Sequence, residues 1–452
     1  MIEQVQKINW RLAPIRGGVL ATFALIPVWH RLSAPPPGFT PLYATQFLIF
    51  LPMIWTIGWW LIMGLPGFHA LRQDRRKLWA FALLLLALWA FASTSWAFIR
   101  ADHPEVGENG ALQFGVVALF AVAASCVGPS ARTIVMIFGI GIAWNSTLTF
   151  LQVARQGPLG LTALGEFPIW PDHPGISVLM AGPIRWLRPY GLLPHPNILG
   201  GFLAIGLLAV LSGIFSTRWR IWLIGTVLFL SGFWALLLTF SRAAWGGFTA
   251  GILVALPYLI ATRLRLSPVR RRVLATATAA LMMAALFAAL YWPLLAARAG
   301  VGEERVELRS VADRIVFTRF AEQAIAENTF LGVGIANFPW RTSYYLLETD
   351  YDLRGDNVHN IFLLAWAELG IVGLGLFIAA IAAGSYAAWQ GLQTQQSGPE
   401  NAMLFGAFAA LAAIGLLDHY PWTLLHFQAA WWGCLAISLH QPQPQEQVAP
   451  PR

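Results

Sequence analysis

The sequence predicts an all-α integral membrane protein with about twelve transmembrane helices. Of its 452 residues, 57% are hydrophobic and only 11% are charged, whereas a soluble domain carries roughly a quarter charged residues. Runs of about 17 to 25 apolar residues are long enough to cross a bilayer as helices. Such runs cover residues 15–33, 41–64, 78–99, 110–128, 132–154, 197–215, 219–240, 243–262, 273–294, 358–389, 401–418 and 421–440.

The positions of Lys and Arg in the short loops predict the orientation, because cytoplasmic loops carry an excess of these residues. The basic groups lie at Lys7/Arg11, Arg72 to Lys77, Arg132, Arg218/Arg220 and Arg263 to Arg272. We expect these groups and both termini inside an inner (cytoplasmic) membrane. The N-terminus lacks a short apolar core with a small-residue cleavage site, so the first apolar run is expected to be a retained span.

The polar intervals divide the chain into six parts. The expected parts are helices 1–5 (1–154), an outer loop (155–196), helices 6–9 (197–294), a large outer loop with an amphipathic helix (295–357), helices 10–12 (358–440) and a disordered Gln- and Pro-rich tail (441–452). Both long loops fall on the same outer face, and the proline-rich first loop is expected to lie along the membrane surface. Cys126 and Cys434 fall within apolar runs and offer no disulfide framework or cysteine-based metal site.

Arginines concentrate in the second long loop. They are Arg298, Arg305, Arg309, Arg314, Arg319, Arg341 and Arg354. Arginine binds phosphate bidentately better than lysine does, although high-GC codon usage would produce the same bias. Ser310-Val-Ala-Asp313 has the pattern of a capping box, which predicts a helix from Val311 to Glu327 with Arg314 in its first turn. The positive end of that helix would favour an anion. We therefore hypothesise that this loop covers a site where a lipid-borne diphosphate is cleaved.

Four short segments carry a more specific signal. They are Arg188-Pro-Tyr-Gly-Leu-Leu-Pro-His195-Pro-Asn197, Phe240-Ser-Arg242, Gly332-Val-Gly-Ile-Ala-Asn-Phe338 and His359-Asn360-Ile-Phe-Leu-Leu-Ala-Trp-Ala-Glu368-Leu-Gly370. Together they resemble the O-antigen ligase and polymerase family of bacterial membrane glycosyltransferases, over roughly residues 185–375. The segment from His359 to Gly370 is the most specific of the four.

The resemblance implies a GT-C-like enzyme that needs no metal or other cofactor. It would move a glycan from an undecaprenyl diphosphate carrier to a sugar hydroxyl, such as one on lipid A core, at the outer side of the inner membrane. The implied partners are this donor, the glycan acceptor and membrane lipid, with no nucleic acid. His359 matches the essential histidine of the ligases. Arg188 and Arg314 match arginines thought to hold the diphosphate, while Arg309 and Arg319 are neighbours of Arg314.

The chemistry of these residue types fits this reaction. Breaking a glycosyl–diphosphate bond builds negative charge on the leaving group, which fixed guanidinium groups stabilise without a metal. A neutral histidine near pH 7 accepts the proton of the incoming hydroxyl, and a single displacement inverts the anomeric carbon. Arg242 has no acidic neighbour in the sequence. Because a charge at membrane depth is costly, we expect it in the site or beside a buried partner.

Structural roles are the alternatives for several of these residues. His195 would cap the helix that starts near Asn197 instead of touching substrate. Glu368 lies nine residues beyond His359, about 13 Å deeper at 1.5 Å per residue, so a buried structural role is favoured. Arg188 and Arg314 would serve as salt-bridge partners within the loops. Asp418 and His419 are expected on the outer side, where they would line the same cavity.

The sequence leaves more than one function open. A ligase is favoured because the outer loop is long and helical with an arginine-rich start. A polymerase or a protein-glycosylating enzyme would use the same donor. A lipid-linked oligosaccharide transporter is the alternative from another class, but its arginines would be expected along a central cavity within the spans.

Overall fold

The computed structural model describes residues 10–29, 41–299, 305–349, 353, 355–394 and 397–440. Its longer helices are α1 (Ala13–Leu25), α2 (Pro41–Ile62), α4 (Lys77–Ser93), α5 (Pro104–Val127), α6 (Ala131–Arg155), α7 (Pro196–Ile214), α8 (Trp219–Leu238), α9 (Arg242–Thr262), α10 (Ser267–Leu290), α12 (Arg305–Glu327), α14 (Ile361–Leu392), α15 (Pro399–Ile414) and α17 (Leu425–Leu439). The shorter elements are η1 (Trp10–Leu12), α3 (Phe68–Arg72), η2 (Thr94–Trp96), η3 (Thr162–Leu164), β1 (Val178–Ala181), β2 (Ile184–Leu187), α11 (Trp292–Arg298), α13 (Phe338–Leu346) and α16 (Tyr420–Thr423).

Long apolar helices confirm a polytopic membrane protein. Among the described residues, eight helices are long and apolar enough to cross a membrane, and Ala13–Leu25, Leu48–Ile62 and Pro399–Ile414 are shorter apolar helices. Each predicted span overlaps one of the longer helices other than α12. The all-helical class is therefore confirmed, while the count of twelve spans and the GT-C class stay predictions. The predicted disordered tail lies outside the described residues.

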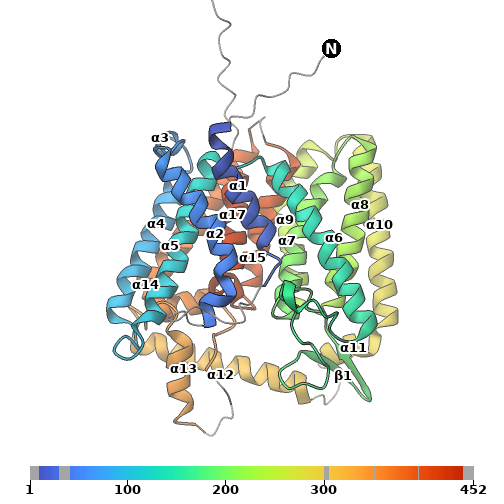
Figure 1. Cartoon of the computed structure of the whole chain (residues 1–452). Helices are drawn as coiled ribbons and strands as arrows, with labels where there is room; N and C mark the ends of the chain where they lie inside the picture. Colours follow the sequence, from blue (N-terminus) through green and yellow to red (C-terminus); the bar gives the residue numbers. More distant parts are fainter. Residues whose placement is uncertain are drawn as a thin grey trace, which may run out of the picture.

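The bundle has a buried centre and an apolar rim. Helix α17 is buried along its whole length and packs against α5 and α15. Helix α10 lies at the edge of the bundle (Figure 1), where Leu281 and Met282 are 72% and 69% exposed. An apolar surface on a 24-residue helix is stable against lipid but not against water.

The two long loops lie at the same end of the bundle. Helices α11, α12 and α13 and the hairpin β1–β2 gather there, opposite the end that carries α3 (Figure 1). Helix α12 runs across this end, nearly perpendicular to the spans (Figure 1). It packs against α14 and α13, so the long polar interval forms a covering layer over one end of the bundle.

The predicted start of this covering helix is wrong. Helix α12 begins at Arg305, so Ser310 lies inside it and does not cap it, although the predicted end at Glu327 is right. The residues ahead of Ser310 include Glu, Leu and Arg, which are good helix formers and extend the helix past a cap-like pattern. Arg314 consequently lies in the third turn, away from the positive end of the helix dipole.

The first long loop contains a hairpin that was not predicted. Strands β1 and β2 pair antiparallel, with Val178 opposite Leu187 and Ala181 opposite Ile184. Gly182, with φ of +57°, forms the turn, and the Gly-Pro pair at this point was the available signal. Arg188 follows the second strand directly, so the hairpin positions a predicted site residue.

A break in α14 joins the covering layer to the bundle. Gly370 has φ of 68° and ψ of −175° within the helix, so neighbouring carbonyls lose their helical partners. The backbone N–H groups of Val333 and Gly334 donate to the carbonyl oxygens of Ala367 and Glu368, both at 2.8 Å. The loop after α12 thereby satisfies the groups that the break exposes.

We expect Gly370→Ala to destabilise the protein by at least about 1–3 kcal/mol, the usual cost of a strained backbone residue. An added Cβ would also collide with the Phe330 carbonyl group. The measurement is the midpoint of thermal unfolding in detergent. Gly375→Ala is the matched control, because Gly375 lies in the same helix and a Cβ there meets no atom within 4 Å. Equal midpoints for the two variants would contradict this role of the break.

Candidate functional site

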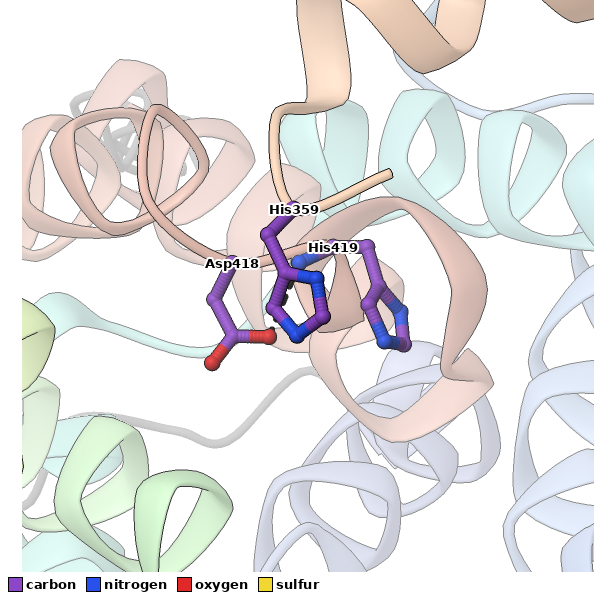
Figure 2. Close-up of side chains that lie close together, drawn as sticks. All are labelled: His359, Asp418 and His419. Carbon is purple, nitrogen blue, oxygen red and sulfur yellow. Dashed lines mark hydrogen bonds between the residues drawn. The ribbon is translucent and has the colours of Figure 1, made fainter. Parts of the chain in front are cut away.

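Three side chains form a compact cluster at the covered end of the bundle. His359 lies just before α14, and Asp418 and His419 lie in the turn between α15 and α16. One ligand-type atom from each lies within 4.8 Å of the others. Figure 2 shows the Asp418 carboxylate and the His419 ring on either side of the His359 imidazole. The two imidazole rings are nearly perpendicular, at 79°, with centroids 5.2 Å apart.

The start of α14 holds His359 in place. Asn360 is the N-cap residue, and its Oδ1 accepts hydrogen bonds from the N–H groups of Phe362 (2.9 Å) and Leu363 (3.1 Å). The N–H of Ile361 donates to the carbonyl oxygen of Gly415 at 2.8 Å. These bonds bring the start of α14 to the turn that carries Asp418. The buried Nδ1 of His359 has no hydrogen-bond partner among the described residues.

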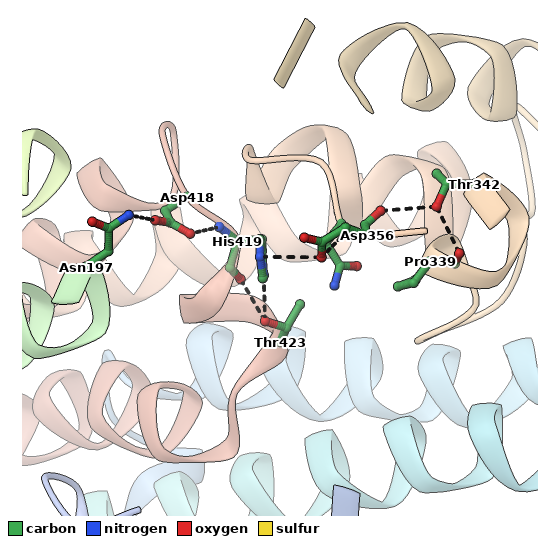
Figure 3. Close-up of polar contacts among 8 residues, drawn as sticks. Asn197, Pro339, Thr342, Asp356, Asp418, His419 and Thr423 are labelled. Atoms are coloured by element: carbon green, nitrogen blue, oxygen red, sulfur yellow. Dashed lines mark hydrogen bonds and ion pairs between the residues drawn. The ribbon is translucent and has the colours of Figure 1, made fainter. Parts of the chain in front are cut away.

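Asp418 connects this cluster to the segment that ends in Asn197. It is only 5% exposed. Its Oδ2 accepts a hydrogen bond from Asn197 Nδ2 at 3.1 Å, and its Oδ1 accepts one from the His419 backbone N–H at 2.9 Å. Figure 3 shows this chain of contacts from Asn197 through Asp418 to His419. Two predicted segments, far apart in sequence, thus meet at one carboxylate.

Arg188 orients Asn197. Its Nη2 donates to Asn197 Oδ1 at 2.7 Å, its Nε donates to the Thr239 carbonyl oxygen at 2.7 Å, and its Nη1 donates to Ser177 Oγ at 2.9 Å. Only 3% of its surface is exposed. The guanidinium group is therefore a fixed positive charge inside the network.

His195 is the N-cap of α7, which was one of its two predicted roles. Its Nδ1 accepts a hydrogen bond from the Asn197 N–H at 3.2 Å. Burial, aided by the positive charge of Arg188, lowers the pKa of His195 to about 3. The ring is therefore neutral at pH 7.

His419 is anchored by its Nδ1. That atom lies 3.0 Å from Thr423 Oγ1, within hydrogen-bond distance. Its Nε2 lies 4.0 Å from an oxygen of Asp356, whose side chain is 54% exposed (Figure 3). Nδ1 is thus held by Thr423, and Nε2 points toward the Asp356 carboxylate.

Charges around the cluster set the protonation of His359 and Asp418. Burial is the largest cause and lowers the pKa of His359 below its ordinary value. Asp418 raises this pKa, while His419 and Arg314 lower it further. Burial by itself would raise the pKa of Asp418, but the three neighbouring histidines and Arg314 bring it below its ordinary value. The favoured state has a neutral imidazole beside an ionised carboxylate.

The other predicted arginines lie at different places. Arg314, from α12, acts electrostatically on both His359 and Asp418. Arg242 is exposed at the start of α9, and its Nη1 donates to the Arg298 carbonyl oxygen at 3.0 Å. The Arg309 side chain lies outside the described part of the structure.

Arg298 is a cation near the network that was not among the predicted site residues. It ends α11, and its Nε donates to the Phe240 carbonyl oxygen at 3.3 Å. Its charge also lowers the pKa of His195, so it lies near the network. The available signal was its position at the beginning of the arginine-rich interval.

Glu368 makes the contacts of a buried structural partner. It is 1% exposed, and its Oε2 accepts a hydrogen bond from Trp422 Nε1 at 2.9 Å. The carboxylate also accepts hydrogen bonds from the N–H groups of Ala336 and Phe338. It therefore ties the break in α14 to the loop before α13 and to α16.

Comparison with known proteins adds a family to this geometry. A family model described as O-antigen ligase matches residues 226–378. This match supports assignment to the O-antigen ligase and polymerase family. It agrees with the family expected from the four segments, three of which lie within the matched residues, and that family is one of membrane glycosyltransferases. No match is found among curated proteins.

The residues matched by the O-antigen ligase family model include only part of the network. They include His359, Arg242 and Arg314, whereas Arg188 and Asp418 lie outside them. The tertiary contacts described above connect the two groups.

Proposed function

We propose that the protein is an O-antigen ligase-type glycosyltransferase. It moves a glycan from undecaprenyl diphosphate to a sugar hydroxyl of a lipid A core-like acceptor. The observation that carries this proposal is the His359 imidazole beside the buried Asp418 carboxylate, with the Arg314 charge acting on both. The family match supports the same class of reaction.

His359 is the general base in this proposal. Its lowered pKa keeps the imidazole neutral and able to accept a proton at pH 7. The acceptor oxygen forms a bond to the anomeric carbon as its proton passes to His359. The bond from that carbon to the phosphate oxygen breaks at the same time, and its electron pair leaves with the diphosphate. Asp418 stabilises the imidazolium that results, because an opposite charge close by favours the protonated ring.

Arginines stabilise the departing diphosphate. Arg314 is the candidate whose charge lowers the pKa of His359, the proposed base. Arg188 and Arg242 also remain proposed contacts, and Arg298 joins them because its charge reaches His195. Fixed guanidinium groups near a low-dielectric boundary stabilise developing negative charge without reorganising. The proposed single displacement inverts the anomeric carbon and uses no metal.

The site is proposed to face the outer side of the inner membrane. The end opposite the covering layer supports this orientation, because it carries the basic segment around α3 (Figure 1) and short cytoplasmic loops have an excess of Lys and Arg. The arginines of the covering layer belong to a long loop, which this rule does not govern. Ligase is preferred to polymerase because helix α12 is long and packs over the site end.

The decisive experiment is transfer by the purified protein in nanodiscs. The mixture contains an undecaprenyl diphosphate-linked glycan, a lipid A core acceptor and no added divalent metal. A single transferred glycan on the acceptor supports the ligase. A ladder of longer lipid-linked chains identifies a polymerase, and movement of the intact donor between leaflets without any transfer identifies a transporter.

We expect kcat/KM for transfer to fall at acid pH only below about pH 6.5, the ordinary pKa of histidine. A base with a lowered pKa is already deprotonated above that value, and it becomes protonated as the pH falls through its own pKa. The measurement is kcat/KM against pH, which reports groups of the free enzyme. Asp418→Asn should move the acid limb to lower pH, because the Asp418 charge raises the pKa of His359. A shift to higher pH would contradict the proposed pairing.

A further inference from the structure

We propose that His359, Asp418 and His419 form a binding site for a divalent transition-metal ion such as Zn²⁺, and that occupancy blocks transfer. The existence of the site rests on the geometry of the three side chains. Only the inhibitory consequence rests on the proposed function. The metal would be a regulator and not a participant in the reaction.

The three donors have the chemistry that Zn²⁺ prefers. Two imidazole nitrogens and a carboxylate oxygen are common zinc ligands, bound at about 2.0–2.2 Å. Two atoms bound at that distance to one ion at the tetrahedral angle are about 3.3–3.6 Å apart. The donor atoms lie within 4.8 Å of one another, so side-chain rotations that bring them up to about 1.5 Å closer would close the site.

The surroundings orient two of the donors as in protein metal sites. A histidine ligand usually has its second ring nitrogen held by a hydrogen bond, which selects the tautomer. Thr423 Oγ1 is positioned to hold the Nδ1–H of His419 at 3.0 Å, which leaves Nε2 as the lone-pair donor. Asp418 is likewise fixed by Asn197 and by a backbone N–H.

The third donor, His359, has a ring nitrogen without a hydrogen-bond partner among the described residues. This atom, Nδ1, is buried. A buried polar atom without a partner costs free energy, and an ion bound through this nitrogen would recover part of that cost.

The local charge balance permits a cation. Arg314 opposes binding, because its positive charge acts on both His359 and Asp418. The carboxylates of Asp418 and Asp356 offset it. Asp356 lies 4.0 Å from His419 Nε2 and is partly exposed, so it is available as a fourth oxygen ligand or as the holder of a bound water. Zinc sites with three protein ligands leave a fourth position open to water.

Occupancy of this site would remove the base. Zn²⁺ would take the imidazole lone pair that His359 uses to accept the hydroxyl proton. It would also place positive charge where the imidazolium must form. Transfer should therefore be inhibited reversibly, and a chelator should restore it.

The first test measures binding by titration calorimetry with ZnCl₂. The full-length protein is purified without a polyhistidine tag and treated with chelator beforehand. We expect one site, with affinity lowered at least about tenfold in His419→Gln, which loses a ligand, and in Thr423→Val, because loss of a hydrogen bond that orients a ligand typically costs 10–100-fold in affinity. Thr423→Val keeps all three ligands and the side-chain shape, so it remains informative if His419→Gln folds poorly. His103→Gln is the control, since His103 is an exposed histidine paired with Glu105, and it should bind as the wild type does.

Two results would overturn the metal site. One is the absence of a Zn²⁺ site in the wild-type protein. The other is equal affinity in the wild type, His419→Gln and Thr423→Val, which would place the ion elsewhere. Binding of Co²⁺ with the strong visible absorption of a four-coordinate ion would support the site, and the weak absorption of an octahedral ion would count against it.

The second test measures transfer with added Zn²⁺ and then with chelator. We expect inhibition of the wild type that chelator reverses, and inhibition of Thr423→Val only at least about tenfold higher Zn²⁺. Equal sensitivity of the two proteins would contradict inhibition through this site. If transfer is absent without metal, the proposed function fails, and the binding measurement still decides the metal site independently.

Discussion

Replacing His359 by Ala should reduce glycan transfer by about 10²–10⁴-fold, the usual contribution of a general base. The imidazole is neutral, lies beside an ionised carboxylate and is anchored by the cap at the start of α14. The measurement is the initial rate of transfer from the lipid diphosphate donor to the acceptor by purified protein. In cells, the same variant should lose surface glycan while the lipid-linked precursor accumulates on the outer leaflet.

The matched control for this variant is His173→Ala. His173 is an exposed histidine in the first long loop, at the same end of the bundle, and its loss should leave the rate unchanged. A His359→Ala protein that folds normally and retains more than about a tenth of the rate would be inconsistent with a general base. Accumulation of the precursor on the inner leaflet would instead indicate a transporter.

Replacing Arg314 by Ala should lower the rate of transfer by about 10²–10³-fold, the range seen when one group that stabilises developing negative charge is removed. The guanidinium group comes from the covering helix α12 and acts on both His359 and Asp418. Its loss should also raise the pKa of His359, because its positive charge now lowers that pKa. The acid limb of the pH profile should therefore move to higher pH.

Arg319→Ala tests whether Arg314 is special among its neighbours. Arg319 lies on the same helix and is exposed, so its removal subtracts the same charge from the same element. We expect little change in either the rate or the pH profile. Equal losses for the two variants would show a general effect of loop charge and would remove Arg314 from the site.

The geometry divides the predicted arginines into different roles. Arg188 is buried within three hydrogen bonds and orients Asn197, which in turn holds Asp418. Arg242 is exposed and contacts the end of α11. Arg314 is the cation whose field reaches the proposed base. The three arginines therefore come from separate parts of the chain and differ in burial and in partners.

Properties that depend on residues adjacent in the sequence could be predicted from the sequence alone. Runs of apolar residues predicted the long helices, because a spanning helix satisfies its own backbone and needs only length and hydrophobicity. The segment from His359 to Gly370 indicated the family, and the resemblance implied the role now proposed for His359. The capping box at Ser310 failed because the residues before it also favour helix. The hairpin before Arg188 was missed because its strands are only four residues each.

The composition of the site was decided by tertiary packing. Asp418 and His419 lie about sixty positions after His359, and they meet it because Ile361 at the start of α14 bonds to Gly415 at the end of α15. Arg314 acts electrostatically on the same cluster, and it belongs to α12, which crosses the end of the bundle (Figure 1). Hydrophobicity and helix propensity are summed over adjacent residues and can be read locally. The proximity of charged side chains instead depends on how distant helices pack, and no run of neighbouring residues records it.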